Sequence, residues 1–313
     1  MDATDINVEN EYGQTTGEVR HQVNTRDGQS LTCFFRKAEN AHSNNLPFVI
    51  TYHDVGINHI TCFNPFFEHP KMKTALPFMN IIHIEAPGHQ YKAETIPEDD
   101  YPTFTQLAKD ILYVLEYFKV KNFIGFGVGV GGAVLTQFAI LQPKYVVGLI
   151  LVGSELKGFG WMETMKHWVG WKTMPSTKNP QSVFNYLLDH YHSDNPNIME
   201  TIKVEVSNIN MENMCHYIDS YLKREDIKMS DIRALRAKVL VIVGKDATDA
   251  EDIVELFSHF NPSSATLLQV PDCGLLVTAE NPTFMIEPFK LYMQGCGYML
   301  DYYLSVGDDD PQE

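Results

Sequence analysis

The sequence has little of what marks secreted, membrane-spanning or nucleic-acid-binding proteins. Its 5 cysteines are scattered and contain no C-x-x-C pair, which favours reduced thiols over disulfides or a zinc site. The N-terminus lacks the basic and apolar segments of a secretory signal, and no apolar run is long enough to cross a bilayer. Basic residues number 24 against 40 acidic ones, and the net charge of −16 opposes binding to a phosphate backbone. We therefore expect a cytoplasmic protein with neither a transmembrane segment nor a nucleic-acid partner.

Apolar segments alternate with amphipathic ones along most of the 313 residues. Residues 18–25 and 30–37 alternate in polarity on either side of Asp27-Gly28, a pattern typical of a β-hairpin. Further strands are predicted at 47–53, 78–84, 145–152, 238–244 and 266–270, with another that begins at Asn122 and runs into a glycine-rich turn, and helices at 103–118, 133–140, 251–260 and 282–295. Nearly continuous apolar strands that alternate with helices predict an α/β fold with a mostly parallel sheet and helices on both faces.

One long segment interrupts this alternation. Residues 155–233 are rich in Trp, Met and Tyr and contain no convincing strand, which predicts a helical cap inserted into the sheet domain. The expected organisation is a flexible acidic N-terminus at 1–17, an α/β domain formed by 18–154 and 234–300, the cap at 155–233, and an acidic tail at 301–313.

The most informative stretch is residues 122–141, NFIGFGVGVGGAVLTQFAIL. A strand, a glycine-rich turn and a helix form the local architecture of the nucleophile elbow of α/β-hydrolases, whose sequence form is G-x-S-x-G. The frame fits at residues 127–131, but Gly129 stands in place of the serine. The elbow therefore lacks a nucleophile.

The same glycines fit two other patterns. Gly127-x-Gly129-x-x-Gly132 matches the dinucleotide-binding fingerprint, yet the next acidic residue, Glu155, comes several residues too late. The four-residue glycine spacing also resembles a transmembrane dimer motif, but the apolar run is too short to span a bilayer. A generic buried β-turn-α without a site remains compatible with the elbow interpretation, which we prefer.

The other two catalytic positions of the fold can also be located. The acid normally follows the strand after the cap, and Ala247 occupies that position, with Asp246 and Asp249 close by in sequence. The histidine normally follows the last strand in a D-x-G-H frame, where this chain has Leu275. Loss of the nucleophile alone lowers turnover by about six orders of magnitude.

The expected pocket lies beside the elbow. HDVG follows a strand at the place where such folds have the oxyanion loop. We therefore expect five residues to face the old pocket, meaning the cavity that holds the substrate in an active hydrolase of this fold. They are His53, Asp54, Val55, Gly56 and Val130. The competing interpretation is that the HDVG side chains only hold the loop through backbone hydrogen bonds. His53 and His89 could join as metal ligands, but no spacing is diagnostic and neither a metal nor a cofactor is expected.

With these motifs placed, the chain resembles the N-myc downstream-regulated (NDR) protein family. The segments that carry the resemblance include TYHDVGIN at 51–58, GFGVGVGG at 125–132, VIVGKDA at 241–247 and QGCGYM at 294–299. The resemblance implies an α/β-hydrolase fold without hydrolase activity, in cytoplasmic proteins tied to differentiation, stress response, signalling and trafficking. The family often carries a Ser/Thr-rich tail, whereas this chain ends in an acidic segment, so regulation through such a tail is not carried over.

A pocket without catalysis would leave binding as the function, and two surfaces are candidates. Trp161, Met165 and Trp168 lie at helical spacing in the cap, where they either pack on the sheet domain or form a groove for a protein partner. A basic segment offers weak, salt-sensitive contact to anionic lipid or an acidic partner, or else is merely solvated. Its residues are Lys223, Arg224, Lys228, Arg233, Arg236 and Lys238.

Two hypotheses follow from the sequence. The first is a non-enzymatic interaction or adaptor protein with protein partners. The alternative is an enzyme or small-molecule-binding protein that uses the old pocket by non-standard chemistry. The oligomeric state is not predicted by either.

Overall fold

The computed structural model describes residues 7–9, 15–40, 46–156, 185, 187, 190, 191, 193, 195–300 and 302. The described residues form a nine-stranded sheet in the order β1-β2-β3-β5-β4-β6-β7-β8-β9. The strands from β5 to β9 pair in parallel, and β1, β2 and β3 form the antiparallel edge. Their bounds are β1 Asn7–Glu9, β2 Thr15–Asn24, β3 Ser30–Arg36, β4 Phe48–Tyr52, β5 Asn80–Ile84, β6 Phe123–Val128, β7 Val146–Val152, β8 Lys238–Gly244 and β9 Ala265–Val270.

The predicted hairpin is confirmed, and the N-terminus requires a correction. β2 and β3 are antiparallel and are joined by a short 3-10 turn, Arg26–Gly28, in which Gly28 has φ 79°. Residues 1–17 were expected to lie outside the sheet, but Asn7–Glu9 pairs with β2, and β2 itself begins at Thr15. An edge strand presents unpaired backbone groups, and a short neighbouring segment satisfies them here.

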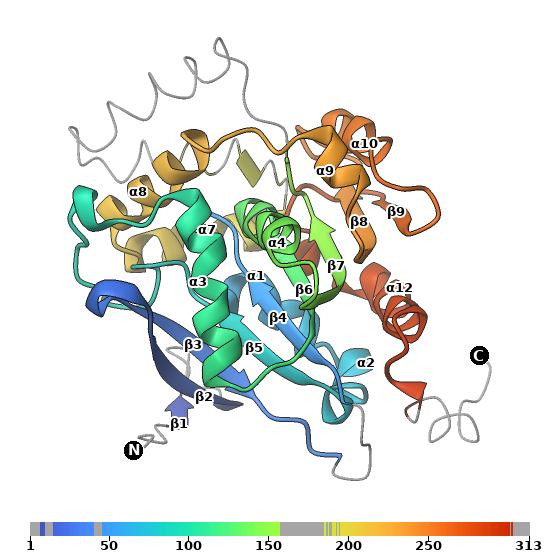
Figure 1. Ribbon diagram of the computed structural model, residues 1–313, viewed down its shortest axis with the longest axis horizontal. Coiled ribbons are helices and arrows are strands. Elements are labelled where there is room, and N and C mark those ends of the chain that lie inside the picture. Colours follow the sequence, from blue (N-terminus) through green and yellow to red (C-terminus); the bar gives the residue numbers. More distant parts are fainter. Residues whose placement is uncertain are drawn as a thin grey trace.

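Helices cover both faces of the sheet (Figure 1). α3, Phe104–Tyr117, packs against α4, Val130–Leu141, on one face. On the other face, α1 contacts α2, α11 and α12. The remaining bounds are α1 His59–Phe67, α2 Pro70–Lys73, α10 Ala250–Phe257, α11 Val277–Glu280 and α12 Pro282–Gly295. The predicted helices and parallel strands are thereby confirmed, with α12 and β8 at the predicted residues.

The core sits between the sheet and these helices. All six residues of β6 are buried, and α4 is buried over most of its length because it lies between the sheet and α3. On the α1 side, the rings of Phe63 and Phe66 contact Phe126 of β6 at centroid distances of 5.2 and 5.6 Å. All five cysteines are free thiols. None of the helices in the described part of the chain is long and apolar enough to cross a membrane.

The described part of the cap is helical and contains no strand. It includes α7, Pro196–Asn208, α8, Met211–Leu222, and α9, Met229–Arg233. Residues 185, 187, 190 and 191 are also helical. The cap lies over the carboxyl ends of the parallel strands (Figure 1). Trp161, Met165 and Trp168, the predicted apolar stripe, lie outside the described residues.

The boundary of the C-terminal tail also moves. Residues 301–313 were expected to form an acidic tail separate from the domain. Tyr302 is instead buried, and its hydroxyl lies 3.1 Å from Oγ1 of Thr74 after α2. Its ring also packs against Phe78 at a centroid distance of 5.5 Å. The domain therefore extends at least to this residue, because a large aromatic side chain gains by burial.

Candidate functional site

The turn between β6 and α4 has the geometry of a nucleophile elbow. β6 ends at Val128, α4 begins at Val130, and Gly129 between them has φ 52° and ψ −121°. Side chains rarely adopt this backbone conformation, and a glycine does so without a Cβ clash. Gly131 is needed for a different reason, since a Cβ there would lie 2.0 Å from the carbonyl oxygen of Tyr52. The glycines thus let α4 start directly against β4.

The carboxylate of Asp54 fills the space in which a nucleophile side chain would begin. An ideal Cβ built on Gly129 would lie 2.1 Å from Cγ of Asp54 and 2.2 Å from each carboxylate oxygen. Asp54 follows β4 in the HDVG loop and is fully buried. The sequence motif alone did not indicate that the Asp54 carboxylate would lie against Gly129.

Both oxygens of Asp54 are engaged. Oδ1 accepts the backbone N–H of Val130 at 2.9 Å, and Oδ2 lies 2.8 Å from Nε2 of His190 in the cap. In α/β-hydrolases, the amide of the residue after the nucleophile donates to the oxyanion of the reaction intermediate. Here the Val130 amide donates instead to the Asp54 carboxylate, so the donor is not available to an oxyanion.

His190 was not identified from the sequence. It lies 136 residues from Asp54 and belongs to no motif, so only the folded cap brings the two together. Burial alone would lower the pKa of His190, but the Asp54 carboxylate outweighs it and raises that pKa, with smaller contributions from Asp249 and Glu155. The carboxylate thus shifts His190 toward its imidazolium form, and the contact joins the cap to the sheet domain.

Apolar side chains stand at the two positions that the sequence frames assign to the acid and the histidine. Ala247 and Leu275 are buried, and Cγ of Leu275 lies 2.7 Å from the point that a Cβ on Gly153 would occupy. Leu275 thus packs tightly where the fold usually places its histidine. Of the two nearby acids, Asp246 is exposed, whereas Asp249 is half-buried. Burial, with Asp249 and Asp252, raises the pKa of Glu155 to about 7.

The HDVG loop is held by backbone hydrogen bonds. Nδ1 of His53 donates to the carbonyl of Asp54 at 2.7 Å, and Nε2 accepts the N–H of Ala86 at 2.9 Å. This pattern ties the loop to the segment after β5, where Nε2 of His53 also lies 3.2 Å from Oε2 of Glu85. It supports the interpretation of His53 as a loop anchor.

The cap docks on the same loop. The hydroxyl of Tyr191 donates to the carbonyl of Val55 at 2.6 Å, and that of Tyr217 donates to the carbonyl of His53 at 3.3 Å. Gly56 has φ 71°, and a Cβ there would lie 2.5 Å from Leu187 of the cap. Four of the five residues predicted to face the pocket therefore contact the cap, namely His53, Asp54, Val55 and Gly56.

A histidine metal site receives no support from this geometry. The rings of His53 and His89 lie 5.2 Å apart, and burial together with His53 lowers the pKa of His89 to about 3. Within the described ranges, no cluster of three His, Cys, Asp or Glu side chains is arranged to hold a metal ion.

A second group of ionisable side chains lies behind the HDVG loop. Oε1 of Glu85 accepts the backbone N–H of His59 at 3.0 Å and also contacts Nδ1 of its ring. Nε2 of His59 lies 3.4 Å from Oε2 of Glu18, and Nε2 of His83 lies 3.5 Å from Oε1 of Glu18. All four side chains are buried. The sequence did not reveal this cluster because its members come from β2, α1 and β5 and the loop that follows.

The pKa values of this cluster are shifted by burial and by the charged partners. Burial alone would lower the pKa of His59, but Glu85 and Glu18 raise it to about 9. Burial alone would raise the pKa of both glutamates. The neighbouring His53 and His59 nevertheless hold the pKa of Glu85 below its usual value. His83 and His59 do the same for the pKa of Glu18. Burial lowers the pKa of His83, so the ion pairing in the cluster rests mainly on His59 with the two glutamates.

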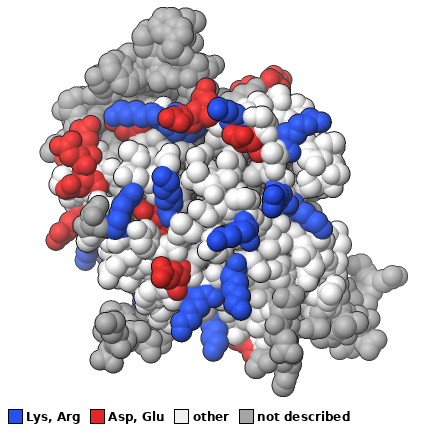
Figure 2. Space-filling view, in the orientation of Figure 1, with Lys and Arg blue, Asp and Glu red and all other residues white. Residues whose placement is uncertain are grey.

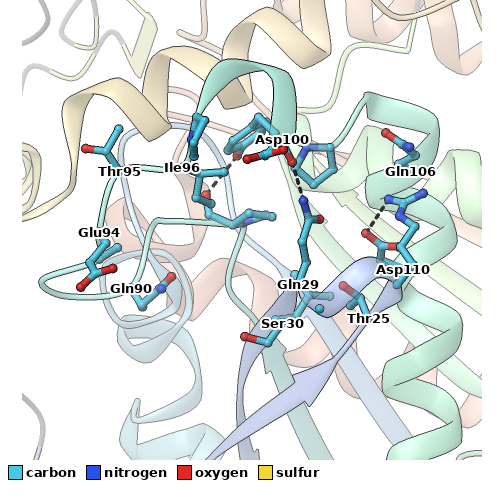
Figure 3. A pocket seen from close by; sticks show the side chains of 18 of the residues that line it. Thr25, Gln29, Ser30, Gln90, Glu94, Thr95, Ile96, Asp100, Gln106 and Asp110 are labelled. Carbon is cyan, nitrogen blue, oxygen red and sulfur yellow. Dashed lines mark hydrogen bonds and ion pairs between the residues drawn. The ribbon is translucent and has the colours of Figure 1, made fainter.

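A polar cleft of about 780 Å³ lies nearby, between the β2–β3 turn, the loop at 87–102 and α3 (Figure 3). Arg26 and Asp110 form an ion pair of 3.1 Å on its wall, and Gln29 donates to the carbonyl of Asp100 at 2.5 Å. Burial raises the pKa of Asp110 to about 6, although Arg26 opposes this. The residues that line the cleft do not include Asp54, Gly129 or His190, so it is separate from the elbow.

The predicted basic segment does not form one exposed surface. Arg224 is buried, with its guanidinium carbon 3.7 Å from the ring centroid of Tyr221, and it donates to the carbonyl of Tyr221 at 2.8 Å. Lys223 pairs with Asp219 at 2.9 Å. The other members are exposed and lie further along the chain, namely Lys228, Arg233, Arg236 and Lys238. Arg224 is thus corrected from a surface cation to a packing residue.

Comparison with known proteins gives consistent matches over most of the chain. The model of the Ndr family matches residues 21–300. An NDRG-like protein from Dictyostelium discoideum is 55% identical over 296 residues, covering 93% of this chain and 90% of that protein. Protein NDRG4-B from Xenopus laevis is 33% identical over 265 residues, covering 82% of this chain and 71% of that protein. A solved esterase from Thermogutta terrifontis superposes with a TM-score of 0.73 at 16% identity, covering 89% of this chain and 98% of the esterase, and so shares its fold.

Proposed function

The chain belongs to the Ndr family and has the α/β-hydrolase fold, and we propose that it acts as a non-enzymatic interaction or adaptor protein. The observation that carries this proposal is the position of the Asp54 carboxylate. It occupies both the nucleophile side-chain space at Gly129 and the amide of Val130 that an oxyanion would need.

The electrostatics at this point oppose ester hydrolysis. A tetrahedral intermediate places a negative oxygen against the amide of the elbow, and here that amide already holds a buried negative group. Removal of one oxyanion donor alone costs about 10²–10³ in turnover, and removal of the nucleophile about 10⁶. Leu275 supplies no general base in the usual histidine position. The missing nucleophile, general base and oxyanion donor would all be needed for the same step, the formation of the tetrahedral intermediate.

The docking of the cap supports a role as a scaffold. Hydrogen bonds from Tyr191 and Tyr217, and the ion pair of His190 with Asp54, hold the cap on the loop that would otherwise shape a substrate pocket. These contacts tie the cap to the sheet domain, and we therefore place partner binding on the outer surface of the molecule. We propose protein partners in the cytoplasm and, from family membership, a role in signalling, stress response, differentiation or trafficking.

The Asp54–His190 pair favours one second candidate function. An aspartate beside an oxyanion donor and a histidine is the arrangement of a covalent carboxylate nucleophile. Such a nucleophile needs an oxygen that faces the substrate, whereas Asp54 is fully buried and both of its oxygens are engaged. The interaction role is therefore preferred.

Two experiments test the proposed function. The purified protein is treated with a fluorophosphonate probe and with a panel of short-chain esters, and we expect neither labelling nor turnover above background. An affinity pull-down from the native source should recover protein partners. Probe labelling or saturable ester turnover would contradict the proposal.

A further inference from the structure

Charge is unevenly distributed between the two edges of the parallel sheet. The segments that lead into β6, β7, β8 and β9, at 118–122, 142–145, 234–237 and 258–264, contain no Asp or Glu. This absence stands out in a chain with 40 acidic and 24 basic residues. These segments and the first residue of β8 carry Lys119, Lys121, Lys144, Arg236 and Lys238, here called the amino-edge cations.

The sheet register brings these residues side by side. Phe123 at the start of β6 pairs with Val146 at the start of β7, and Gly148 of β7 pairs with Lys238 of β8. Neighbouring strands lie about 4.8 Å apart, so the cations that precede them form one row along the edge. The N–H of Phe123 donates to the carbonyl of Tyr145 at 2.9 Å, which ties two of these segments together.

The opposite edge is acidic. Glu155, Asp246, Asp249 and Asp272 follow the carboxyl ends of β7, β8 and β9. Figure 2 shows one face of the molecule, on which basic side chains fill the middle and lower part and also occur along the top, while most acidic ones lie toward the top and left. The segments that lead into β6 to β9 are thus basic although the chain has a net charge of −16.

All five amino-edge cations are exposed, and none forms an ion pair with another residue in the part of the chain that the structure describes. Lys238 donates to the carbonyl of Gly295, and Nζ of Lys144 lies 4.7 Å from the ring centroid of Tyr145, so the charge offered to a partner rests mainly on Lys119, Lys121 and Arg236. Exposed apolar side chains lie among them, since Tyr117 is 47% exposed and Leu141 is 37% exposed. Cations interleaved with aromatic and aliphatic groups are typical of surfaces that contact the headgroup region of a membrane.

We propose that the amino edge of the sheet, defined by the amino-edge cations with Tyr117 and Leu141, docks on an anionic lipid bilayer. The cations come from the ends of successive elements and form a row, and none of them lines the polar cleft of about 780 Å³. Such a row suits a flat charged layer better than it suits a peptide that needs a groove. The acidic edge and the cap then point away from the bilayer. This places the lipid contact at the sheet edge and not on residues 223–224, which the sequence had included.

The net charge of the rest of the molecule limits the strength of this contact. A charge of −16 repels an anionic surface at long range, and salt screens the attraction of the amino edge within about 10 Å. We therefore expect weak binding that depends on the density of anionic lipid and is lost at high ionic strength.

The test is co-sedimentation of the full-length protein with vesicles of phosphatidylcholine, with or without about 30% phosphatidylserine. The test variant carries Lys119→Glu, Lys121→Glu and Lys144→Glu. A control variant carries Lys92→Glu, Lys109→Glu and Lys245→Glu, which are exposed lysines away from the amino edge. Both variants change the net charge equally, so a difference between them reports the location of the contact.

We expect wild type and control to bind the anionic vesicles at low salt and not the neutral ones. The amino-edge variant should bind at least about tenfold more weakly, and about 0.5 M salt should release the wild type. Thermal unfolding checks that both variants fold. If a Glu variant does not fold, Lys→Gln replacements at the same positions are used in its place. The proposal is overturned if wild type fails to bind anionic vesicles at low salt or if both variants lose binding equally. Binding of polyglutamate without binding of vesicles would likewise overturn it and indicate an acidic polypeptide as the partner.

Discussion

Asp54 and Gly129 share the space that a hydrolase gives to its nucleophile. A Cβ on Gly129 would lie 2.1 Å from Cγ of Asp54, closer than any non-bonded carbon contact allows. The glycine and the aspartate are therefore a matched pair, in which the absence of one side chain makes room for the other. The carboxylate in turn binds the amide of Val130 and the ring of His190. This relationship makes the elbow a structural joint between β4, α4 and the cap.

Gly129→Ser should destabilise the protein without creating an esterase. The new side chain displaces Asp54 from two hydrogen bonds and is held at φ 52°, so we expect a loss of about 2–4 kcal/mol in the free energy of unfolding. Urea unfolding measures it. Gly129→Ser combined with Asp54→Gly should recover part of the loss, because the clash is removed. A single variant as stable as wild type would show that the two residues do not compete for space.

Asp54→Asn should lower the pKa of His190. The carboxylate is the group that raises this pKa against the effect of burial, so burial dominates once the charge is removed. An NMR titration of the histidine ring follows the change, and Asp246→Asn at an exposed site is the matched control. If the pKa of His190 were the same in wild type and Asp54→Asn, the ion pair between cap and sheet domain would not exist in solution.

The buried cluster around Glu85 should give the protein a defined pH dependence. The pKa of His59 is raised from 6.5 to about 9, so its contribution to stability is complete below 6.5 and is lost as pH rises through about 9. The pKa values of Glu18 and Glu85 lie below 4.5, so their contribution is present above 4.5 and is lost as pH falls below it.

Glu85→Gln isolates this effect. Removal of one partner from a buried ion pair costs about 3–5 kcal/mol, and the fall in stability between pH 6.5 and 9 should become shallower because the pKa of His59 drops. Urea unfolding at a series of pH values gives both quantities. Glu68→Gln, at a more exposed carboxylate, should change little by comparison. An unchanged pH profile in Glu85→Gln would exclude His59 as the source of the alkaline loss.

Glu205→Ala should loosen the cap from the sheet domain. Glu205 of α7 is buried and accepts hydrogen bonds from Nδ2 of Asn58 at 2.7 Å and from Oγ1 of Thr61 at 2.8 Å. Its removal leaves two buried donors without a partner, at a cost of about 1–3 kcal/mol each. Hydrogen exchange in Pro196–Asn208 should rise, whereas Glu200→Ala at an exposed site on the same helix should have little effect. Limited proteolysis that released a separately folded cap would contradict this coupling.

Much of the fold was predictable because local patterns and packing agree. Buried parallel strands are indicated by apolar segments such as Val146–Val152 that alternate with helices. The elbow is indicated by the spacing of the glycines around Gly129. Neither prediction needs a contact with a residue far along the chain. The edge strand Asn7–Glu9 was not predictable, because its three residues carry little pattern and its pairing depends on the exposed edge of β2.

The site was predictable only in part. Gly129, Ala247 and Leu275 lie in motif frames, so their positions follow from spacing along the chain. The Asp54–His190 pair and the Glu18–His59–Glu85 cluster depend on contacts between residues far apart in sequence, and no local pattern encodes them. Arg224 was misjudged for the same reason, because its burial against Tyr221 and Phe104 is a tertiary contact.

If the elbow is a structural joint and not a catalytic site, steady-state ester hydrolysis should detect no activity. Wild type, Asp54→Asn and His190→Ala are compared on the same short-chain esters at matched concentrations. We expect all three to give the rate of the buffer alone. Saturable turnover by wild type that is lost in Asp54→Asn and His190→Ala would contradict it, and would identify the Asp54–His190 pair as a catalytic one.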